Sequence, residues 1–225
     1  MKSLQLKYVI LLILVILFLD QGLKFYIKLG FEPNRNTELT GLKWFKLHFI
    51  ENPGMAWGWK FGNETGKVIL TLFRLVAVVF GTWYLGRIVK QKYSRGFIVC
   101  AALIYAGALG NLIDSMFYGM IFDKGLVYDA AAKDYISYSG IAQLSSNGYS
   151  SFLHGAVVDM LYFDLFKIGN FEFFSAIFNI ADASISIGVI TLLLFQKRFF
   201  KKADEENTPV VVQTDTPIND TTQVY

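Results

Sequence analysis

Four long apolar runs alternate with polar stretches along the chain. Their approximate limits are residues 8–27, 68–89, 97–117 and 173–195. Each run is close to the roughly 20 residues that a helix needs to cross the hydrocarbon core of a bilayer. The pattern therefore predicts an all-α polytopic membrane protein with four transmembrane helices.

The two long connections between these runs differ in pattern. In residues 30–66, apolar and polar residues alternate through LKWFKLHFIENPGMAWGWKFGN, and Pro53-Gly54 marks a turn. This predicts a small extracytoplasmic β subdomain between helices 1 and 2, with Trp44, Trp57 and Trp59 suited to the headgroup region. The connection between helices 3 and 4 is expected to be an extended extracytoplasmic insertion.

Composition agrees with a membrane protein. Of the 225 residues, 54% are hydrophobic and 16% are aromatic, an apolar share above that of an ordinary soluble domain. We expect one membrane-embedded domain at 1–202 and a disordered cytoplasmic tail at 203–225, which is polar and rich in threonine. The net charge of +3 is small and says little about partners. Separately, we expect a monomer with no nucleic-acid partner.

The first run has a second interpretation, because Lys2 and Lys7 precede an apolar stretch as they would in a cleaved signal peptide. No small-x-small cleavage site follows, which favours a membrane helix. Basic residues cluster in GRIVKQKYSRG, between the second and third runs, and in QKRFFKK, after the fourth. Cytoplasmic segments carry such clusters, so both termini are predicted to be cytoplasmic and both long connections extracytoplasmic.

The fourth run contains Asn179 and Asp182. If Asp182 lies at the helix centre, it costs about 3 kcal/mol of insertion free energy. The apolar residues of the run contribute about −0.5 kcal/mol each and offset this cost. An ionisable residue inside a span indicates function by default. The alternative is a structural anchor, hydrogen-bonded between helices or paired with Arg74 of the second run.

A second acid, Asp159, follows Val157 and Val158 and precedes the fourth run. Asp159 and Asp182 are too far apart to meet by helical spacing, so they must converge through a turn around KIGNFE. Two close carboxyls share a proton near neutral pH. One can then deprotonate a water while the other protonates a substrate carbonyl, which is the chemistry of peptide hydrolysis without a nucleophile or a metal.

Other hydrolytic chemistries are poorly supported by the sequence. Cys100 is the single cysteine, which excludes a disulfide framework and a cysteine-rich zinc site. His48 and His154 are the two histidines, and neither lies in an apolar run. The chain contains no HExxH motif and no Gly-x-Ser-x-Gly elbow. The sequence therefore does not support a zinc site or a serine mechanism.

Polar residues also interrupt the first and third runs. In YAGALGNLIDSMF, Gly107 and Gly110 permit close helix contact, and Asn111 and Asp114 share one helical face. The alternative is ordinary small-residue packing with polar groups at the end of a span. In DQGLK, Asp20 and Lys24 are four residues apart, and this pair could instead be an interfacial ion pair of little energetic weight.

Five blocks in order carry a family resemblance. They are DQGLK (20–24), ENPGMAW (51–57), GALGNLID (107–114), VVD (157–159) and FNIAD (178–182). Together they resemble the lipoprotein signal peptidases, also called signal peptidase II, which are four-span aspartic peptidases of bacterial inner membranes.

The resemblance implies a catalytic dyad of Asp159 and Asp182. It implies supporting roles for Asp20, Lys24, Asn52, Gly54, Gly107, Asn111, Asp114, Asn179 and Ala181. The implied reaction is cleavage of the signal peptide from diacylglyceryl-modified prolipoproteins, immediately N-terminal to the lipidated cysteine and at the extracytoplasmic face. The implied partners are these substrates, membrane lipid and globomycin-type inhibitors, without a metal or cofactor.

The chain departs from the family pattern in two places. Where the family usually reads GNxxDR, this chain has GNLIDS, so Ser115 replaces an arginine and Arg74 is a candidate source of the charge. The segment at about 119–153 is longer than in most relatives, and is either a tolerated surface insertion or a lid or substrate-docking element.

Two rival functions differ in class from the peptidase. In a small transporter or channel, the acids Asp20, Asp114, Asp159 and Asp182 would line a proton or cation path. Such a path also needs polar groups in the cytoplasmic halves of the helices, yet these halves are almost wholly apolar. A structural scaffold would leave the five polar blocks without a reason, so the peptidase is favoured.

Overall fold

The computed structural model describes residues 4–38, 42, 44–54, 64–165, 167–168, 171–172 and 176–199. Its helices are α1 (Leu6–Gly30), α2 (Glu64–Lys90), α3 (Arg95–Ile113), α4 (Gly119–Ile121) and α5 (Ile180–Phe199). A π-helical turn, η1 (Asp114–Tyr118), joins α3 to α4. The predicted tail at 203–225, together with Trp57 and Trp59, lies outside the described residues.

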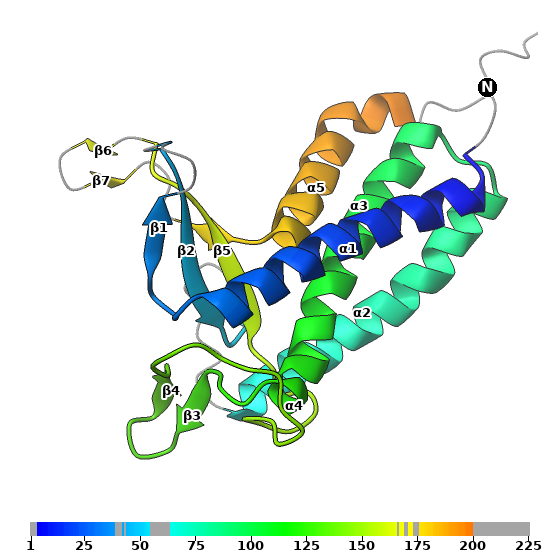
Figure 1. The fold of residues 1–225 in the computed structure, drawn as a ribbon. Helices are drawn as coiled ribbons and strands as arrows, with labels where there is room; N and C mark the ends of the chain where they lie inside the picture. The colour runs from blue at the N-terminus through cyan, green and yellow to red at the C-terminus, as the bar shows by residue number, and fades with distance from the viewer. Residues whose placement is uncertain are drawn as a thin grey trace, which may run out of the picture.

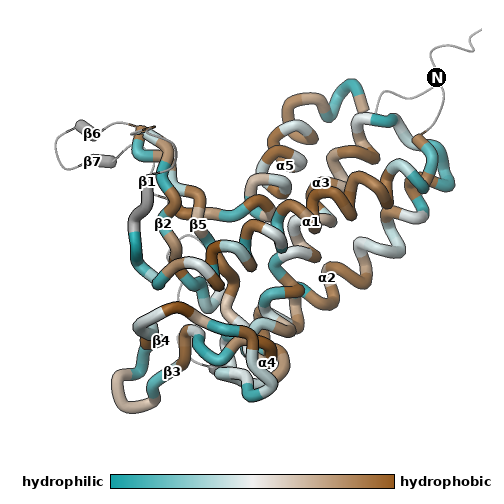
Figure 2. The backbone as a smooth tube through the Cα atoms, viewed as in Figure 1, coloured by the Kyte–Doolittle hydropathy of each residue, from teal (hydrophilic) through white to brown (hydrophobic). Residues whose placement is uncertain are grey.

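Four helical segments are long and apolar enough to cross a membrane. They are Leu6–Gly30, Thr65–Lys90, Arg95–Ile121 and Ile180–Phe199. Apolar residues run along these helices, whereas hydrophilic residues gather at the turn between α2 and α3 (Figure 2). The prediction of a polytopic protein with four spanning helices is confirmed.

The predicted start of the fourth span at residue 173 was wrong. The described residues 177–178 form strand β8 (Ile177–Phe178), and helix α5 begins only at Ile180. Asn179 sets this boundary, because its Oδ1 accepts the backbone N–H of Asp182 at 2.8 Å, as an N-cap residue does. Asp182 therefore lies in the first turn of α5 and not at the centre of a span.

A small antiparallel sheet is built from both long connections. It contains β1 (Asn36–Glu38), β2 (Phe45–Asn52), β5 (Val157–Phe163) and β8, in the order β1-β2-β5-β8. The predicted β region between helices 1 and 2 is thus present and is extended by strands that follow helix 3. Two hairpins flank it: β3 (Val127–Asp129) with β4 (Asp134–Ile136), and β6 (Lys167–Ile168) with β7 (Phe171–Glu172).

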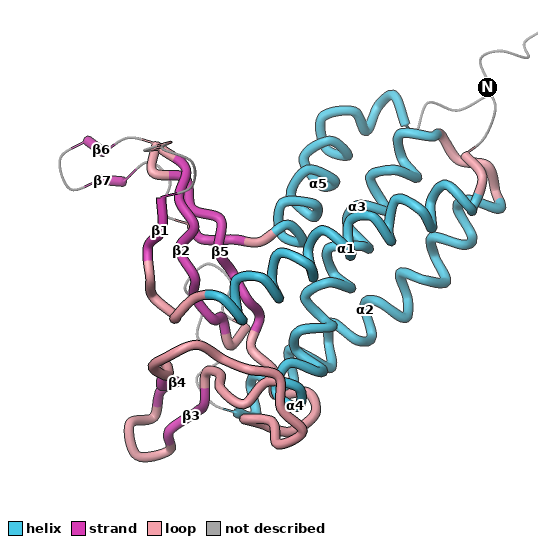
Figure 3. Tube along the Cα trace, viewed as in Figure 1, coloured by secondary structure: helices cyan, strands magenta, loops and turns pink. Residues whose placement is uncertain are grey.

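The sheet lies at the end of the bundle that is far from the N-terminus (Figures 1 and 3). Helix α1 runs the length of the bundle, and its C-terminal end reaches the sheet (Figure 1). One apolar cluster, around Val9, Ile88 and Ile98, holds the helices together at the N-terminal end of α1. A second, around Ile27 and Val158, joins α1 to the sheet.

Small residues allow α3 and α5 to pack closely, as the sequence predicted for Gly107. A β-carbon added at Gly107 would collide with the carbonyl oxygen of Ala181 and lie 2.6 Å from Cγ1 of Ile185. The first turns of α5, which carry Asp182, are therefore held against α3 at a distance that only glycine permits.

We predict that Gly107→Val lowers the free energy of unfolding by about 1–3 kcal/mol, because overpacking forces α3 and α5 apart. Thermal unfolding in detergent micelles measures the change. Gly86→Ala is the matched control, since an added β-carbon at Gly86 meets nothing within 4 Å. Equal melting temperatures for Gly107→Val and Gly86→Ala would contradict the close contact.

Candidate active site

Asp159 lies on β5 with its carboxylate enclosed. Only 2% of the residue is exposed. Its Oδ1 accepts a hydrogen bond from Asn179 Nδ2 at 2.6 Å, and its Oδ2 accepts one from Asn52 Nδ2 at 3.2 Å. Two amides, one from the start of α5 and one from the end of β2, therefore hold this carboxylate.

Asp182 faces the same site from the first turn of α5. Its Oδ1 accepts a hydrogen bond from Asn111 Nδ2 of α3 at 2.7 Å, and its Oδ2 accepts the backbone N–H of Asn179 at 3.4 Å. Asn179 in turn accepts the N–H of Asp182, so the two residues cap the helix reciprocally. Asn179 thus contacts both acids, and the predicted convergence of Asp159 and Asp182 is present in the fold.

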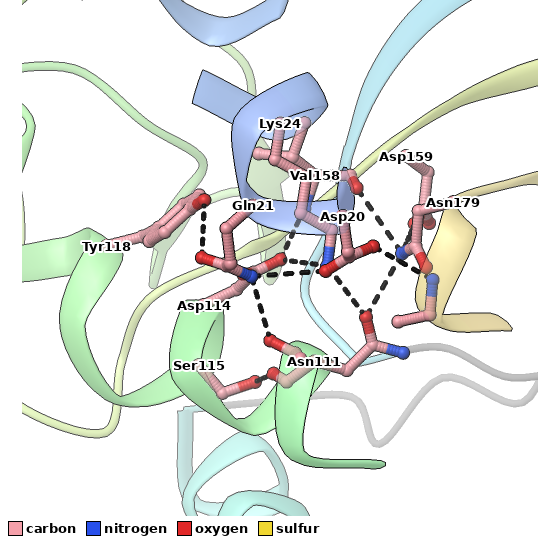
Figure 4. Close-up of polar contacts among 12 residues, drawn as sticks. Asp20, Gln21, Lys24, Asn111, Asp114, Ser115, Tyr118, Val158, Asp159 and Asn179 are labelled. Carbon is pink, nitrogen blue, oxygen red and sulfur yellow. Dashed lines mark hydrogen bonds and ion pairs between the residues drawn. The ribbon is translucent and has the colours of Figure 1, made fainter. Parts of the chain in front are cut away.

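The side-chain amides of Asn179 and Asn111 are hydrogen-bonded to each other. Asn179 Nδ2 donates to Asn111 Oδ1 at 3.1 Å, and Lys24 Nζ donates to the same oxygen at 3.0 Å (Figure 4). With two donors on its oxygen, Asn111 must direct its Nδ2 towards Asp182. Lys24 therefore fixes the orientation of the amide that holds one of the two acids.

A buried ion triad lies behind these amides. Lys24 Nζ is 2.8 Å from Asp20 Oδ2 and 2.8 Å from Asp114 Oδ2, and the three side chains are at most 1% exposed. With Asn111, these two carboxylates occupy all three ammonium donors. The alternative of an interfacial Asp20–Lys24 pair with little energetic weight was wrong, because removing one partner would leave a buried charge uncompensated.

Each acid of the triad also holds the backbone beside one of the paired aspartates. Asp20 Oδ1 accepts the N–H of Ala181 at 2.8 Å, at the N-terminus of α5 and next to Asp182. Asp114 Oδ2 accepts the N–H of Val158 at 3.3 Å, next to Asp159. The triad therefore positions both strand β5 and helix α5 from a single point.

Gly54 gives Asn52 its orientation. Its backbone φ of +110° lies in a region that residues with a side chain rarely adopt. This conformation lets the Gly54 N–H donate to Asn52 Oδ1 at 2.8 Å, which leaves Asn52 Nδ2 directed at Asp159. All site residues predicted from the sequence are thus described and gathered in one region.

Sequence reasoning missed two members of this network. Gln21 Nε2 donates to Asp20 Oδ2 at 3.1 Å and to Asp114 Oδ1 at 2.9 Å, and Tyr118 donates its hydroxyl to Gln21 Oε1 at 3.1 Å. Gln21 stands inside the DQGLK block, where an amide within an apolar run needs partners. That signal was available in the sequence, whereas nothing local points to Tyr118.

Arg74 of α2 reaches the position at which this chain departs from the family pattern. Its Nη1 donates to Ser115 Oγ at 3.0 Å, and Ser115 donates to the carbonyl of Asn111 at 2.9 Å. The guanidinium also lies within electrostatic reach of the carboxyl groups of Asp182, Asp114 and Asp159. A cation from a different helix is thus present beside Ser115, as hypothesised.

Burial dominates the electrostatics of Asp159. The loss of water and then the negative charge of Asp182 raise the pKa of its carboxyl to about 8, against opposing effects of Lys24, Asn52 and Asn179. Burial beside Asp182 therefore favours the protonated form of Asp159. In the part of the chain that the structure describes, no group of three or more His, Cys, Asp or Glu residues is arranged to hold a metal ion.

Comparison with known proteins identifies the family. A family model described as "Signal peptidase (SPase) II" matches residues 12–198, which include the whole site. The chain belongs to the signal peptidase II family. Signal peptidase II enzymes are aspartic peptidases, and the four spanning helices together with this family indicate a bacterial inner-membrane protein.

Named relatives and a solved structure agree with this family. A "Lipoprotein signal peptidase" of Porphyromonas gingivalis strain W83 is 39% identical over 206 residues, covering 85% of this chain and 84% of the relative. One from Amoebophilus asiaticus is 31% identical over 193 residues, covering 80% and 74%. A solved "Bacterial membrane enzyme structure" is 25% identical with a TM-score of 0.55, covering 90% and 96%.

We predict that Lys24→Met lowers the free energy of unfolding by about 3–5 kcal/mol, because it leaves two buried carboxylates without a counter-charge. Chemical denaturation in mixed micelles measures the change. The control is Lys197→Met, which replaces an exposed lysine in the last turn of α5. If both variants unfold at the same denaturant concentration, the triad does not stabilise the fold.

Proposed function

We propose that the protein cleaves signal peptides from diacylglyceryl-modified prolipoproteins, immediately before the lipidated cysteine, with Asp159 and Asp182 as its catalytic dyad. The family and the names of the relatives support the class of substrate. The observation that carries the dyad is Asn179, which donates to Asp159 and caps the turn that holds Asp182. Two carboxyls held by one asparagine are the groups that this reaction needs.

In the proposed mechanism the two acids exchange protons through a water. Asp182 takes a proton from the water, and the water oxygen attacks the scissile carbonyl carbon. At the same time Asp159 gives its proton to the carbonyl oxygen. The resulting tetrahedral diol collapses as the C–N bond breaks. Asp182 then protonates the leaving amine and Asp159 recovers a proton from the diol, so the dyad returns to its starting state.

The raised pKa of Asp159 supports its assignment as the acid. At pH 7 a carboxyl with a pKa of about 8 is mostly protonated and can donate to the substrate carbonyl. Asp182 accepts hydrogen bonds at both oxygens, from Asn111 and from the Asn179 backbone, which orients it as the base. Arg74 is close enough to interact with the negative charge of Asp182, which supports Asp182 as the ionised member of the pair.

The proposed topology has both termini in the cytoplasm and the site at the extracytoplasmic face. Basic residues support it, because Arg87 and Lys90 end α2 and Lys197 and Arg198 end α5. The sheet lies at the opposite end of the bundle (Figure 1).

Lipid contact, sensitivity to globomycin-type inhibitors and a monomeric state belong to the same proposal. The family match gives no support to the rival transporter function.

We predict that Asp159→Asn and Asp182→Asn, made separately, each reduce cleavage of a diacylglyceryl-modified prolipoprotein by about 10²- to 10⁴-fold, the usual weight of one acid or base. A gel-shift assay with purified enzyme measures the rate. Asp164→Asn is the control, because Asp164 forms a partly exposed pair with Lys46 and should keep full activity. Near-normal cleavage by either variant would contradict the assignment of Asp159 and Asp182 as the catalytic dyad.

The pH profile provides a second prediction. We expect kcat/KM to fall as the pH rises through about 8, because Asp159 then loses the proton that it must donate. The Asn52 hydrogen bond stabilises the ionised carboxylate and lowers this pKa, so Asn52→Ala should move the alkaline limb to higher pH. Asn147→Ala, at an exposed position, is the control. A limb that stays fixed in Asn52→Ala would contradict the role of Asp159 as the acid.

A further inference from the structure

Lys28, in the last turn of α1, is fully buried although it carries a charge. Its Nζ forms an ion pair with Glu51 of β2 and donates to the carbonyl of Lys124 at 3.0 Å. The ammonium also lies 4.9 to 5.3 Å from the centroids of three aromatic rings, those of Phe122, Tyr138 and Tyr149. The segment 122–149 therefore supplies all three of these rings.

Glu51 depends on the same segment. Its side chain is 1% exposed. Oε2 accepts the backbone N–H of Leu126 at 2.7 Å, and Oε1 accepts the hydroxyl of Tyr138 at 3.0 Å. Burial and the charge of Glu51 raise the pKa of the Tyr138 phenol above its usual range, so the phenol remains a donor. A buried ion pair is tolerated when such hydrogen bonds satisfy it.

The segment packs on the face of the sheet that is opposite the Asp159 side chain. Phe49 on β2 and Val158 and Met160 on β5 form one apolar cluster with Phe122. Side chains alternate along a strand, so Asp159 points away from this cluster.

Glu51 and Asn52 are consecutive on β2 and point to opposite faces of the sheet. Glu51 pairs with Val158 and Asn52 pairs with Val157 in the register with β5. On the face that packs against segment 122–149, Glu51 forms its ion pair with Lys28. On the other face, Asn52 donates to Asp159. Holding Glu51 in place therefore also holds the backbone of Asn52, and with it the position from which the Asn52 side chain donates to Asp159.

We propose that segment 122–149 is a positioning element of the peptidase, which locks Glu51 behind the sheet and thereby holds Asn52 against Asp159. In this proposal Glu51 and Tyr138 are positioning residues that act through Asn52. The proposal rests on the proposed catalytic role of Asp159. It differs from a lid, because the segment backs the sheet, and from a tolerated surface insertion, because Lys28 and Glu51 could not remain buried without it.

The first experiment measures the pH profile of kcat/KM for Tyr138→Phe and Glu51→Gln. We expect both to move the alkaline limb to higher pH, in the direction of Asn52→Ala, and to lower kcat by about 10-fold, a loss of roughly 1.4 kcal/mol. The charged groups that face Asp159 are Asp182 on α5, Lys24 on α1 and Arg74 on α2, and all three stay unchanged. Tyr138→Phe keeps the ring, so it remains informative if Glu51→Gln folds poorly.

The matched control is Tyr128→Phe, in the β3–β4 hairpin of the same segment, where the ring packs edge-on against Tyr135. It should leave the limb in place. The double variant Tyr138→Phe/Asn52→Ala should show the limb of Asn52→Ala with no further shift, because both changes remove the same contact. Limbs that do not move in the single variants, or shifts that add fully in the double variant, would overturn the proposal.

A second measurement separates this proposal from the proposed function. Hydrogen exchange at residues 50–54 should be several-fold faster in Tyr138→Phe than in Tyr128→Phe, whatever the role of Asp159. If Asp159→Asn remains active, the dyad assignment fails even where exchange responds as expected. If Asp159→Asn is inactive and exchange at residues 50–54 is unchanged in Tyr138→Phe, the positioning proposal alone fails.

Discussion

The fold depends on one ammonium group placed between two buried carboxylates. Lys24 meets Asp20 on its own helix and Asp114 on η1, and no water-exposed arrangement can replace these contacts, because all three side chains are enclosed. Burying three charges is costly unless each has its partners. Once Lys24 is placed, Asp20 holds Ala181 and Asp114 holds Val158. The arrangement of three helices and one strand therefore follows from satisfying a single cation.

Hydropathy identifies the spans well because the length of an apolar run is a local property. It misplaced the start of the fourth helix, because hydropathy does not distinguish an apolar residue of a strand, such as Phe178 of β8, from one of a helix. The boundary is made by the Asn179 cap, which is a hydrogen-bonding event that a mean hydropathy does not record. For the same reason Asp182 was assigned a cost of mid-membrane burial that it does not bear in the first turn of α5.

Long-range pairing explains what the sequence left open at the site. The four-residue spacing of Asp20, Lys24 and Lys28 places them on one face of α1, but it does not reveal which distant groups neutralise them. The pairing of β2 with β5 places Glu51 where it forms an ion pair with Lys28. The π-helical turn places Tyr118 where it donates a hydrogen bond to Gln21. The five polar blocks named the residues of the site, whereas their partners and orientations required the three-dimensional fold.

Asn179 starts helix α5 and also grips Asp159. The residue that starts the helix therefore also joins the helix to the strand that carries the second acid. A chain whose strand β5 has not yet docked can still cap α5 locally, but it has no assembled pair of acids. The pair of acids therefore forms only when β5 and α5 have come together.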